Sequence, residues 1–290
     1  MRPDLADVHY FTRDVRFPDD YAHRLARAKS RVRGVRERTE GRGPAGLLGA
    51  GEEFVGFRPY ALGEDLRQLD WSLLARSDRA YVRVMRRESS EHWLVRLDAT
   101  ASMGAGVPSK LQLGAELALA LGALGLDAGA SVRVEVVTDG RVASALTVRA
   151  RPALTRLRAL LESTCADGAH AHAPLRARHS AQRVFMLGDF ADVQAASMLA
   201  TVPPRTELTI VQLVARHELA PPAGPVRWVD PETGEELALD LDERARAPYL
   251  ARLGTELERW RAACARRGVK HAWIATDTPF ELALARILGG

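Results

Sequence analysis

The sequence has little lysine, and this shortage limits what its basic charge can mean. Only three lysines, Lys29, Lys110 and Lys270, occur among 290 residues, so the isoelectric point of about 9.4 reflects arginine almost entirely. A GC-rich genome produces this bias, together with abundant alanine and glycine. We therefore do not take the net charge of +4 as a sign of a nucleic-acid partner.

The sequence is also poor in cysteine and has no long apolar run. Cys165 and Cys264 are far apart, which predicts reduced thiols in a cytoplasmic protein. The most apolar segment, Leu111 to Leu126, includes Glu116 and is short for a membrane span, so we expect none. The first residues, Met1 to Asp4, are not followed by an apolar core, so we expect no secretory signal.

Polar side chains follow a short apolar run that begins at Trp93 and predicts a buried strand ending at Asp98. Asp98, Thr100 and Ser102 place one carboxylate and two hydroxyls at alternate positions in a strand-to-helix turn. In an open α/β sheet such turns lie at the carboxyl ends of the strands, where ligands bind. These oxygens suit a hard divalent cation, most naturally Mg²⁺. The alternative is that they only cap the following helix.

A second predicted strand, Arg183 to Gly188, ends at another carboxylate, Asp189. If the sheet is doubly wound, Asp189 should lie beside Asp98 at the point where the strand order reverses. Two adjacent carboxylates repel each other, which raises the pKa of one of them. A metal, a proton or nearby arginines must then compensate for the charge. We therefore predict a Mg²⁺ site formed by Asp98, Thr100, Ser102 and Asp189 and completed by water.

The most specific segment precedes these strands. In it Gly63 allows a turn, and the charges of Asp65, Arg67 and Asp70 can pair locally. Trp71 is large enough to anchor the segment. We expect Trp71 to be buried against the α/β domain and Asp70 to be paired with an arginine, so that the segment acts as a structural clamp.

This segment reads R-x-Y-x-x-G-x-D-x-R-x-x-D-W-x-x-x-A-R and is closely followed by D-x-[ST]-x-S. The pattern resembles the bacterial family known as domain of unknown function fifty-eight, with Leu62 where a proline is usual. The resemblance runs from about Arg31 to the C-terminus. D-x-T-x-S is also similar to the metal-ion-dependent adhesion motif of von Willebrand factor A domains. The residues that match the family pattern are Arg58, Tyr60, Gly63, Asp65, Arg67, Asp70, Trp71, Ala75 and Arg76.

The resemblance implies a von Willebrand factor A-like α/β fold, which is Rossmann-type with a mainly parallel sheet and helices on both faces. We place this domain at residues 80–290, after an N-terminal basic helix and family-specific extension at 1–79. The resemblance further implies a non-catalytic scaffold or adaptor. Such a protein commonly works with a MoxR-type AAA+ ATPase in maturing or remodelling another protein complex, whose identity the sequence does not give.

Two departures from the family pattern concern the predicted metal site. Gly188 replaces the serine of the family's S-D-[FL]-x-D signature. The family's fold also supplies a threonine as the third metal-site group, and none occurs between Gly168 and Leu175. We therefore expect weak, millimolar affinity for Mg²⁺.

The resembled fold also implies a partner surface, because its metal-bearing edge receives an acidic group from another protein. The segments expected to form this rim are Asp98 to Gly106, Cys165 to Pro174 and Gly188 to Asp192. Side chains expected to contribute are the apolar Met103, Val107 and Phe190 and the basic Arg176, Arg178 and Arg183.

Two other functions stay open. Asp98 after a strand, with G-D-x-x-D beginning at Gly188, is similar to a Mg²⁺-dependent haloacid-dehalogenase phosphatase, but Thr100 occupies the place of the required general acid. The other function is nucleic-acid binding through the basic run from Arg24 to Arg42, whose charge would also suit a lipid surface or an acidic partner. This run has no interleaved aromatic residue for base stacking, so we favour a solvated basic face and expect no nucleic-acid partner.

The remaining pattern alternates strands with helices, which predicts an α/β domain. Residues 80–87 are expected to pair with the strand ending at Asp98 as a hairpin. Asp139 and Gly140 predict a hairpin turn into a returning strand at 142–148. The other expected elements are helices at 22–35, 110–126, 152–163, 242–267 and 279–288, strands at 132–137, 208–214 and 271–275, and a hairpin within 228–241.

Overall fold

The structure is a computed structural model that describes residues 11–39, 52–61, 69–77, 79–87, 91–169, 181–191, 195–203 and 206–289. The chain divides into two compact units. One comprises Met1–Gly41 with Glu91–Gly290, and the other comprises Arg42–Ser90. The predicted boundary between residues 79 and 80 differs from this division, because it falls inside the smaller unit.

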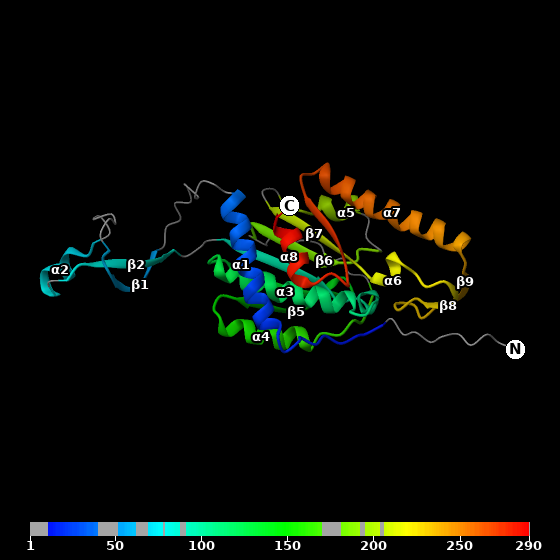
Figure 1. Cartoon of the computed structure of the whole chain (residues 1–290), viewed down its shortest axis with the longest axis horizontal. Coiled ribbons are helices and arrows are strands. Elements are labelled where there is room, and N and C mark those ends of the chain that lie inside the picture. The colour runs from blue at the N-terminus through cyan, green and yellow to red at the C-terminus, as the bar shows by residue number, and fades with distance from the viewer. Residues whose placement is uncertain are drawn as a thin grey trace. The chain divides into compact units, whose positions relative to one another are not determined.

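A six-stranded sheet forms the centre of the larger unit (Figure 1). Its strands are β3 (His92–Asp98), β4 (Ser131–Thr138), β5 (Arg141–Val148), β6 (Arg183–Gly188), β7 (Glu207–Val214) and β10 (Lys270–Ala275). Their order across the sheet is β10-β7-β6-β3-β4-β5, and only β4 and β5 run antiparallel. Because β3 lies between β4 and β6, the strand order reverses between β3 and β6.

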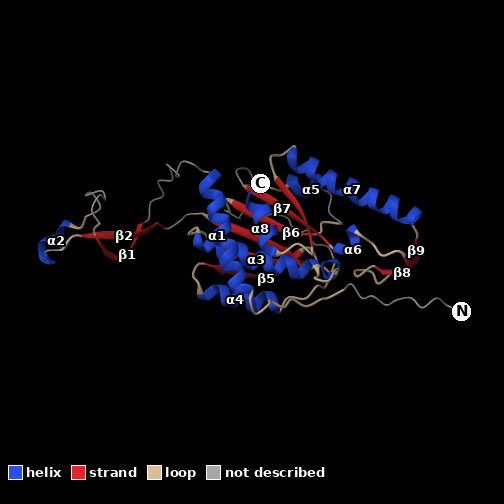
Figure 2. Cartoon of the chain, in the orientation of Figure 1, coloured by secondary structure: helices blue, strands red, loops and turns tan. Residues whose placement is uncertain are grey.

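Helices cover both faces of this sheet (Figure 2). The helices that do so are α1 (Tyr21–Thr39), α3 (Lys110–Asp127), α4 (Pro152–Glu162), α5 (Ala195–Ala200), α7 (Glu243–Ala265) and α8 (Phe280–Gly289). The short helix α6 (Arg216–Leu219) follows β7 and has no buried residue. Trp93, Val95 and Leu97 of β3 belong to one core with α1, α3, α4 and α8, whereas Leu94 belongs to a second core with α5 and α7. This alternation is expected of a strand buried on both faces. The fold class is therefore the predicted one.

Helix α3 is the most buried of these helices, in agreement with its nearly continuous apolar sequence. The hydroxyl oxygen of Ser109 accepts a hydrogen bond from the Gln112 backbone N–H at 3.1 Å and caps the first turn. This cap begins the helix at Lys110, directly after the loop that follows β3. Among the described residues, no helix is both long and apolar enough to cross a lipid bilayer.

Helix α1 belongs to the core of the larger unit. The ring of Tyr21 stacks on Phe280 at 4.7 Å between centroids, and the Arg24 guanidinium donates two hydrogen bonds to the Glu281 carboxylate at 2.7 and 2.8 Å. Lys29 Nζ lies 2.9 Å from Asp127 Oδ2. Two basic residues of the run predicted to be solvated are thus engaged in ion pairs within the chain.

Two hairpins complete the larger unit. Asp139 and Gly140 both adopt positive φ, 49° and 65°, as a two-residue hairpin turn requires, and β5 returns antiparallel to β4. The hairpin prediction at this position is confirmed. Strands β8 (Gly224–Val229) and β9 (Glu236–Leu241) form the other predicted hairpin.

The smaller unit contains an antiparallel pair, β1 (Glu52–Pro59) and β2 (Tyr81–Arg87), and one short helix, α2 (Trp71–Ser77). The predicted pairing of residues 80–87 with β3 is therefore wrong. Strand β3 occupies a central position with parallel neighbours on both sides, so it has no free edge for β2.

Within the smaller unit the Trp71 side chain is 62% exposed, so it does not belong to the interior of this unit. Its burial against the α/β domain stays a prediction. Trp71 is the first residue of α2. The buried residues that the structure describes in this unit are Leu69 and Asp70, which precede α2, and Val82 on β2. Asp70 Oδ1 accepts a hydrogen bond from the Leu73 backbone N–H at 2.9 Å, so this carboxylate caps α2. The small polar side chain, not the large aromatic one, is held in the interior of this unit.

Candidate functional site

The loop after β3 brings the three predicted residues of the motif together. Thr100 donates hydrogen bonds to Asp98 Oδ1 from its backbone N–H at 2.9 Å and from its hydroxyl at 2.8 Å. The hydroxyls of Thr100 and Ser102 are 3.2 Å apart. Asp98 is only 5% exposed, and its other oxygen, Oδ2, is buried with no hydrogen-bond partner among the described residues.

Two distant segments hold this loop in place. The backbone N–H of Thr12 donates to the Gly104 carbonyl at 2.8 Å, and that of Ala101 donates to the Gly168 carbonyl at 2.9 Å. Ala166 in turn donates to the Arg13 carbonyl at 2.9 Å. The motif loop is therefore fixed by backbone hydrogen bonds to the start of the described chain and to the segment after α4.

Asp189 follows β6 and lies beside Asp98, as the reversal of strand order between β3 and β6 requires. The two strands approach closely: a Cβ placed on Gly188 would lie 2.9 Å from Asp98 Cβ. Real Cβ atoms essentially never come this close, so the glycine that replaces the family's serine has a steric reason here.

The charge of these carboxylates is balanced by Lys110, a residue that sequence reasoning missed. Its ammonium group donates to Asp189 Oδ2 at 2.8 Å and to Glu218 Oε1 at 3.1 Å. Lys110 is 3% exposed. The expectation from the sequence was a metal, a proton or nearby arginines. The available signal was that one of only three lysines begins the helix after the motif.

The pKa values follow from burial and from these contacts. Burial and the charge of Asp189 raise the pKa of Asp98 to about 7, against the hydrogen bonds from Thr100. Burial also acts to raise the pKa of Asp189, but the charge and hydrogen bond of Lys110 outweigh it and hold the value below its usual range. Burial alone lowers the pKa of Lys110, yet Asp189 and Glu218 raise it above its ordinary value.

The donor set fits Mg²⁺ only in part. Asp98 Oδ2 and the hydroxyls of Thr100 and Ser102 are oxygen ligands of the kind Mg²⁺ prefers. Asp189, however, is already paired with an ammonium ion. No group of three or more acidic, histidine or cysteine side chains suited to a metal occurs in the described part of the chain. The Mg²⁺ site stays a prediction.

Several side chains expected at the partner surface lie elsewhere. Met103 and Phe190 are buried in the two cores, and Phe190 packs on Trp260 with 5.2 Å between ring centroids. Arg183 begins β6, at the opposite end of the strand from Asp189, where its Nε lies 3.1 Å from Glu207 Oε2. These three assignments are wrong, because strand direction and core packing oppose them. Arg176, Arg178 and Asp192 lie outside the described residues.

Val107 remains at the predicted surface, 64% exposed, directly after the motif loop. The loop is packed against the ends of two further strands, since a Cβ on Gly106 would lie 3.3 Å from both Ala215 Cβ and Thr276 Oγ1. Arg216 follows in α6 and is exposed, and its backbone N–H donates to Thr276 Oγ1 at 3.2 Å. Arg216 thus lies on the rim where we had expected Arg183.

The residues of the family pattern lie in the smaller unit. Arg58 on β1 and both Ala75 and Arg76 on α2 are exposed, and the Tyr60 backbone N–H donates to the Ala80 carbonyl at 2.9 Å. Gly63, Asp65 and Arg67 fall outside the described residues.

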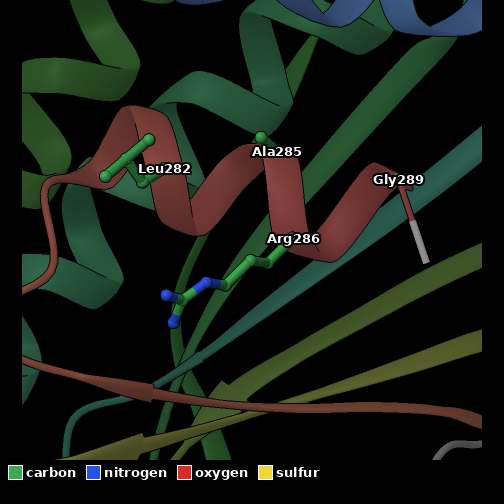
Figure 3. Close-up of a pocket in the computed structure, with 4 residues that line it drawn as sticks. All are labelled: Leu282, Ala285, Arg286 and Gly289. Carbon is green, nitrogen blue, oxygen red and sulfur yellow. The ribbon is translucent and has the colours of Figure 1, made fainter.

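A pocket on α8 is separate from the motif. It is lined by Leu282, Ala285, Arg286 and Gly289 (Figure 3). None of the predicted site residues contributes to it. Its lining holds one charged side chain and no second polar group, so we assign it no chemistry.

The mainly parallel sheet, its antiparallel edge strand and the motif after β3 define a von Willebrand factor A-like α/β protein. A family profile described as "Protein of unknown function DUF58" matches residues 56–258. The chain belongs to the DUF58 family.

Comparison with solved structures finds similar chains, one of which is a conserved hypothetical protein. The crystal structure of the conserved hypothetical protein BatB from Bacteroides thetaiotaomicron is 11% identical, with a TM-score of 0.38. The alignment covers 69% of this chain and 97% of that one. No curated protein matches the sequence.

Proposed function

We propose that this protein is a non-catalytic von Willebrand factor A-like adaptor. It works with a MoxR-type AAA+ ATPase in maturing or remodelling another protein complex. The observation that carries the proposal is the motif edge itself, where Asp98 is buried and Asp189 is paired with Lys110, while Val107 beside them is exposed. The ATPase as partner comes from the family resemblance, and the residues supply the docking face.

The buried state of Asp98 favours binding over catalysis. A nucleophilic aspartate must be ionised and within reach of a substrate. Here Asp98 is 5% exposed, its Oδ1 accepts two hydrogen bonds from Thr100, and its pKa is about 7. Thr100 also stands where a phosphatase would need its general acid. The phosphatase alternative therefore has less support than the adaptor.

The docking face centres on Val107 and extends to Arg216. Val107 is an exposed apolar side chain, and the exposed Arg216 guanidinium lies 3.4 Å from the exposed Asp277 carboxylate. A partner segment with an apolar residue and a carboxylate would contact Val107 and compete with Asp277 for Arg216. Asp189 itself is not the contact, because Lys110 and the protein interior enclose it. A charge reversal at Asp189 would place two ammonium groups together and disturb the fold.

The test is therefore a variant of the surface. Val107→Glu should leave the melting temperature close to that of the wild type and abolish co-purification of the AAA+ ATPase from the native cell. Leu250→Glu, which changes an exposed aliphatic residue on α7, is the matched control and should retain the ATPase. If no AAA+ ATPase accompanies the wild-type protein, the adaptor proposal is wrong. If it accompanies Val107→Glu, the docking face is wrong.

A second measurement addresses the enzyme alternative. The wild type and Asp98→Asn should both fail to hydrolyse a generic aryl phosphate in the presence of Mg²⁺. Turnover by the wild type that is lost in Asp98→Asn would favour the phosphatase.

A further inference from the structure

We propose that the Lys110 ammonium is the resident cation of the motif and that a divalent cation enters only by displacing it. A side chain of the protein then has the charge-balancing role that a bound metal ion was expected to fill, whatever the identity of the partner.

The position of Lys110 in the fold supports this role. The Lys110 backbone N–H donates to the Ala105 carbonyl at 2.9 Å, so the motif loop and the first residue of α3 are joined. From there the side chain reaches Asp189 after β6 and Glu218 on α6. One ammonium thus binds two carboxylates from separate elements, which is what a metal ion does at the edge of a sheet.

The two carboxylates are themselves held in place. Glu218 Oε2 accepts a hydrogen bond from the Ala215 backbone N–H at 2.6 Å, while its Oε1 receives Lys110. Asp189 Oδ1 accepts from the Ala191 backbone N–H at 3.3 Å, while its Oδ2 receives Lys110. Each carboxylate therefore presents one oxygen to the ammonium and one to the backbone, and the cradle is built for a cation at the Nζ position.

A divalent ion would compete with this ammonium for Asp189. Asp98 lies beside Asp189, and its Oδ2 is buried without a hydrogen-bond partner among the described residues. This oxygen would be a further ligand for an ion that displaces the ammonium. Removal of the ammonium leaves Asp189 and Glu218, the two carboxylates that it joins, without the cation that balances them. Asp189 should then attract Mg²⁺ more strongly than it does in the wild type.

The experiment compares Mg²⁺ binding by the wild type, Lys110→Met and the double variant Lys110→Met/Asp189→Asn. Calorimetry and the shift in melting temperature are the measurements. Lys110→Met should bind Mg²⁺ at least about tenfold more tightly than the wild type. The double variant should lose that gain, because it lacks the carboxylate for which the two cations compete. Equal Mg²⁺ affinity in the wild type and Lys110→Met would overturn the proposal.

A measurement on the wild type covers the case in which Lys110→Met does not fold. With only three lysines, ¹⁵N labelling should give one side-chain ammonium signal whose protons exchange slowly, assigned with the charge-retaining Lys110→Arg. That signal should remain unchanged at ~0.05 mM Mg²⁺, well below the millimolar affinity expected of the site, and should be lost as the concentration rises through the millimolar range. Its absence at neutral pH, or its loss at lower Mg²⁺ concentration, would also overturn the proposal.

Discussion

Gly188 and Asp98 lie so close that no side chain fits between them. A Cβ on Gly188 would be 2.9 Å from Asp98 Cβ and 3.0 Å from Asp98 Oδ2. This approach of adjacent parallel strands is what brings Asp98 and Asp189 together at the carboxyl edge. The site therefore depends on the absence of a side chain as much as on its carboxylates.

We predict that Gly188→Ala destabilises the protein by about 1–3 kcal/mol, because the added methyl group overpacks the interior and displaces Asp98. Gly254→Ala is the matched control: Gly254 lies within α7, and nothing would approach its Cβ within 4 Å. That control should be neutral or stabilising by ~0.5–1 kcal/mol. Urea unfolding of both variants measures the difference, and equal stability would contradict the close approach.

Asp98 should make the stability depend on pH. Its pKa is about 7 in the folded chain, above the ordinary aspartate value expected in the unfolded chain. Between about pH 4 and pH 7 the folded chain holds a proton that the unfolded chain releases, so the contribution of Asp98 to stability falls as pH rises. The lowered pKa of Asp189 acts at more acidic pH and in the opposite direction.

The measurement is the free energy of unfolding of the wild type and Asp98→Asn in this window, without divalent metal. Asp98→Asn should gain stability relative to the wild type as pH increases. Gly254→Ala, which changes no ionisable group, is the control and should give a constant difference. A constant difference for Asp98→Asn as well would show that this carboxylate titrates normally.

Tyr21 should be a major contributor to the attachment of α1. Its ring is buried against Phe280, and its hydroxyl donates to the Glu116 carbonyl at 2.5 Å. Tyr21→Ala should cost ~3–5 kcal/mol, as for other buried aromatic residues. Tyr249→Ala, at a half-buried tyrosine that contacts Trp228, should cost clearly less. Similar losses in thermal unfolding would indicate that α1 is only loosely attached.

Because α1 is packed in the core, deletion of the N-terminal segment is not a clean test of its role in partner binding. Deletion of residues 1–42 would remove α1 from the core and expose α8, so loss of a partner after that deletion would not identify a docking element. Substitution of Arg27, an exposed residue of α1, tests the basic surface and leaves the core intact.

In the smaller unit we expect Asp70 to matter more than Trp71. Asp70→Ala removes the cap of α2 and should cost ~0.5–2 kcal/mol, whereas Trp71→Ala should change stability by less than about 0.5 kcal/mol. Thermal unfolding of both variants is the measurement. A large loss for Trp71→Ala would mean that this side chain packs against the α/β domain, as the clamp prediction requires.

The sequence predicted most of the larger unit because its strands and helices have strong local patterns. The run ending at Asp98, the apolar helix from Lys110 and the Asp139-Gly140 turn each match the structure, since burial on both faces and left-handed turn geometry restrict residue choice locally. The pairing of residues 80–87 depended on which edge was free, a property of the whole sheet that no local pattern contains.

The site was predicted less completely than the fold. Strand ends gave Asp98 and Asp189, because parallel strands bring their carboxyl ends to one edge. Lys110 was missed because its role depends on Glu218, which is 108 residues away in the chain. Met103 and Phe190 were placed on the surface because their loops were expected to be open, yet both side chains turn into the cores.

The segment after α4 that hydrogen-bonds to the motif loop also carries one of the two cysteines. Cys165 is exposed and Cys264 is buried, so a thiol-reactive dye should attach at one position without any engineered residue. Burial and the neighbouring Asp14 raise the pKa of the Cys165 thiol, so labelling should proceed faster in mildly alkaline buffer. The protein therefore contains its own attachment point for a fluorescent reporter beside the motif, and binding at that edge becomes measurable on the unmodified sequence.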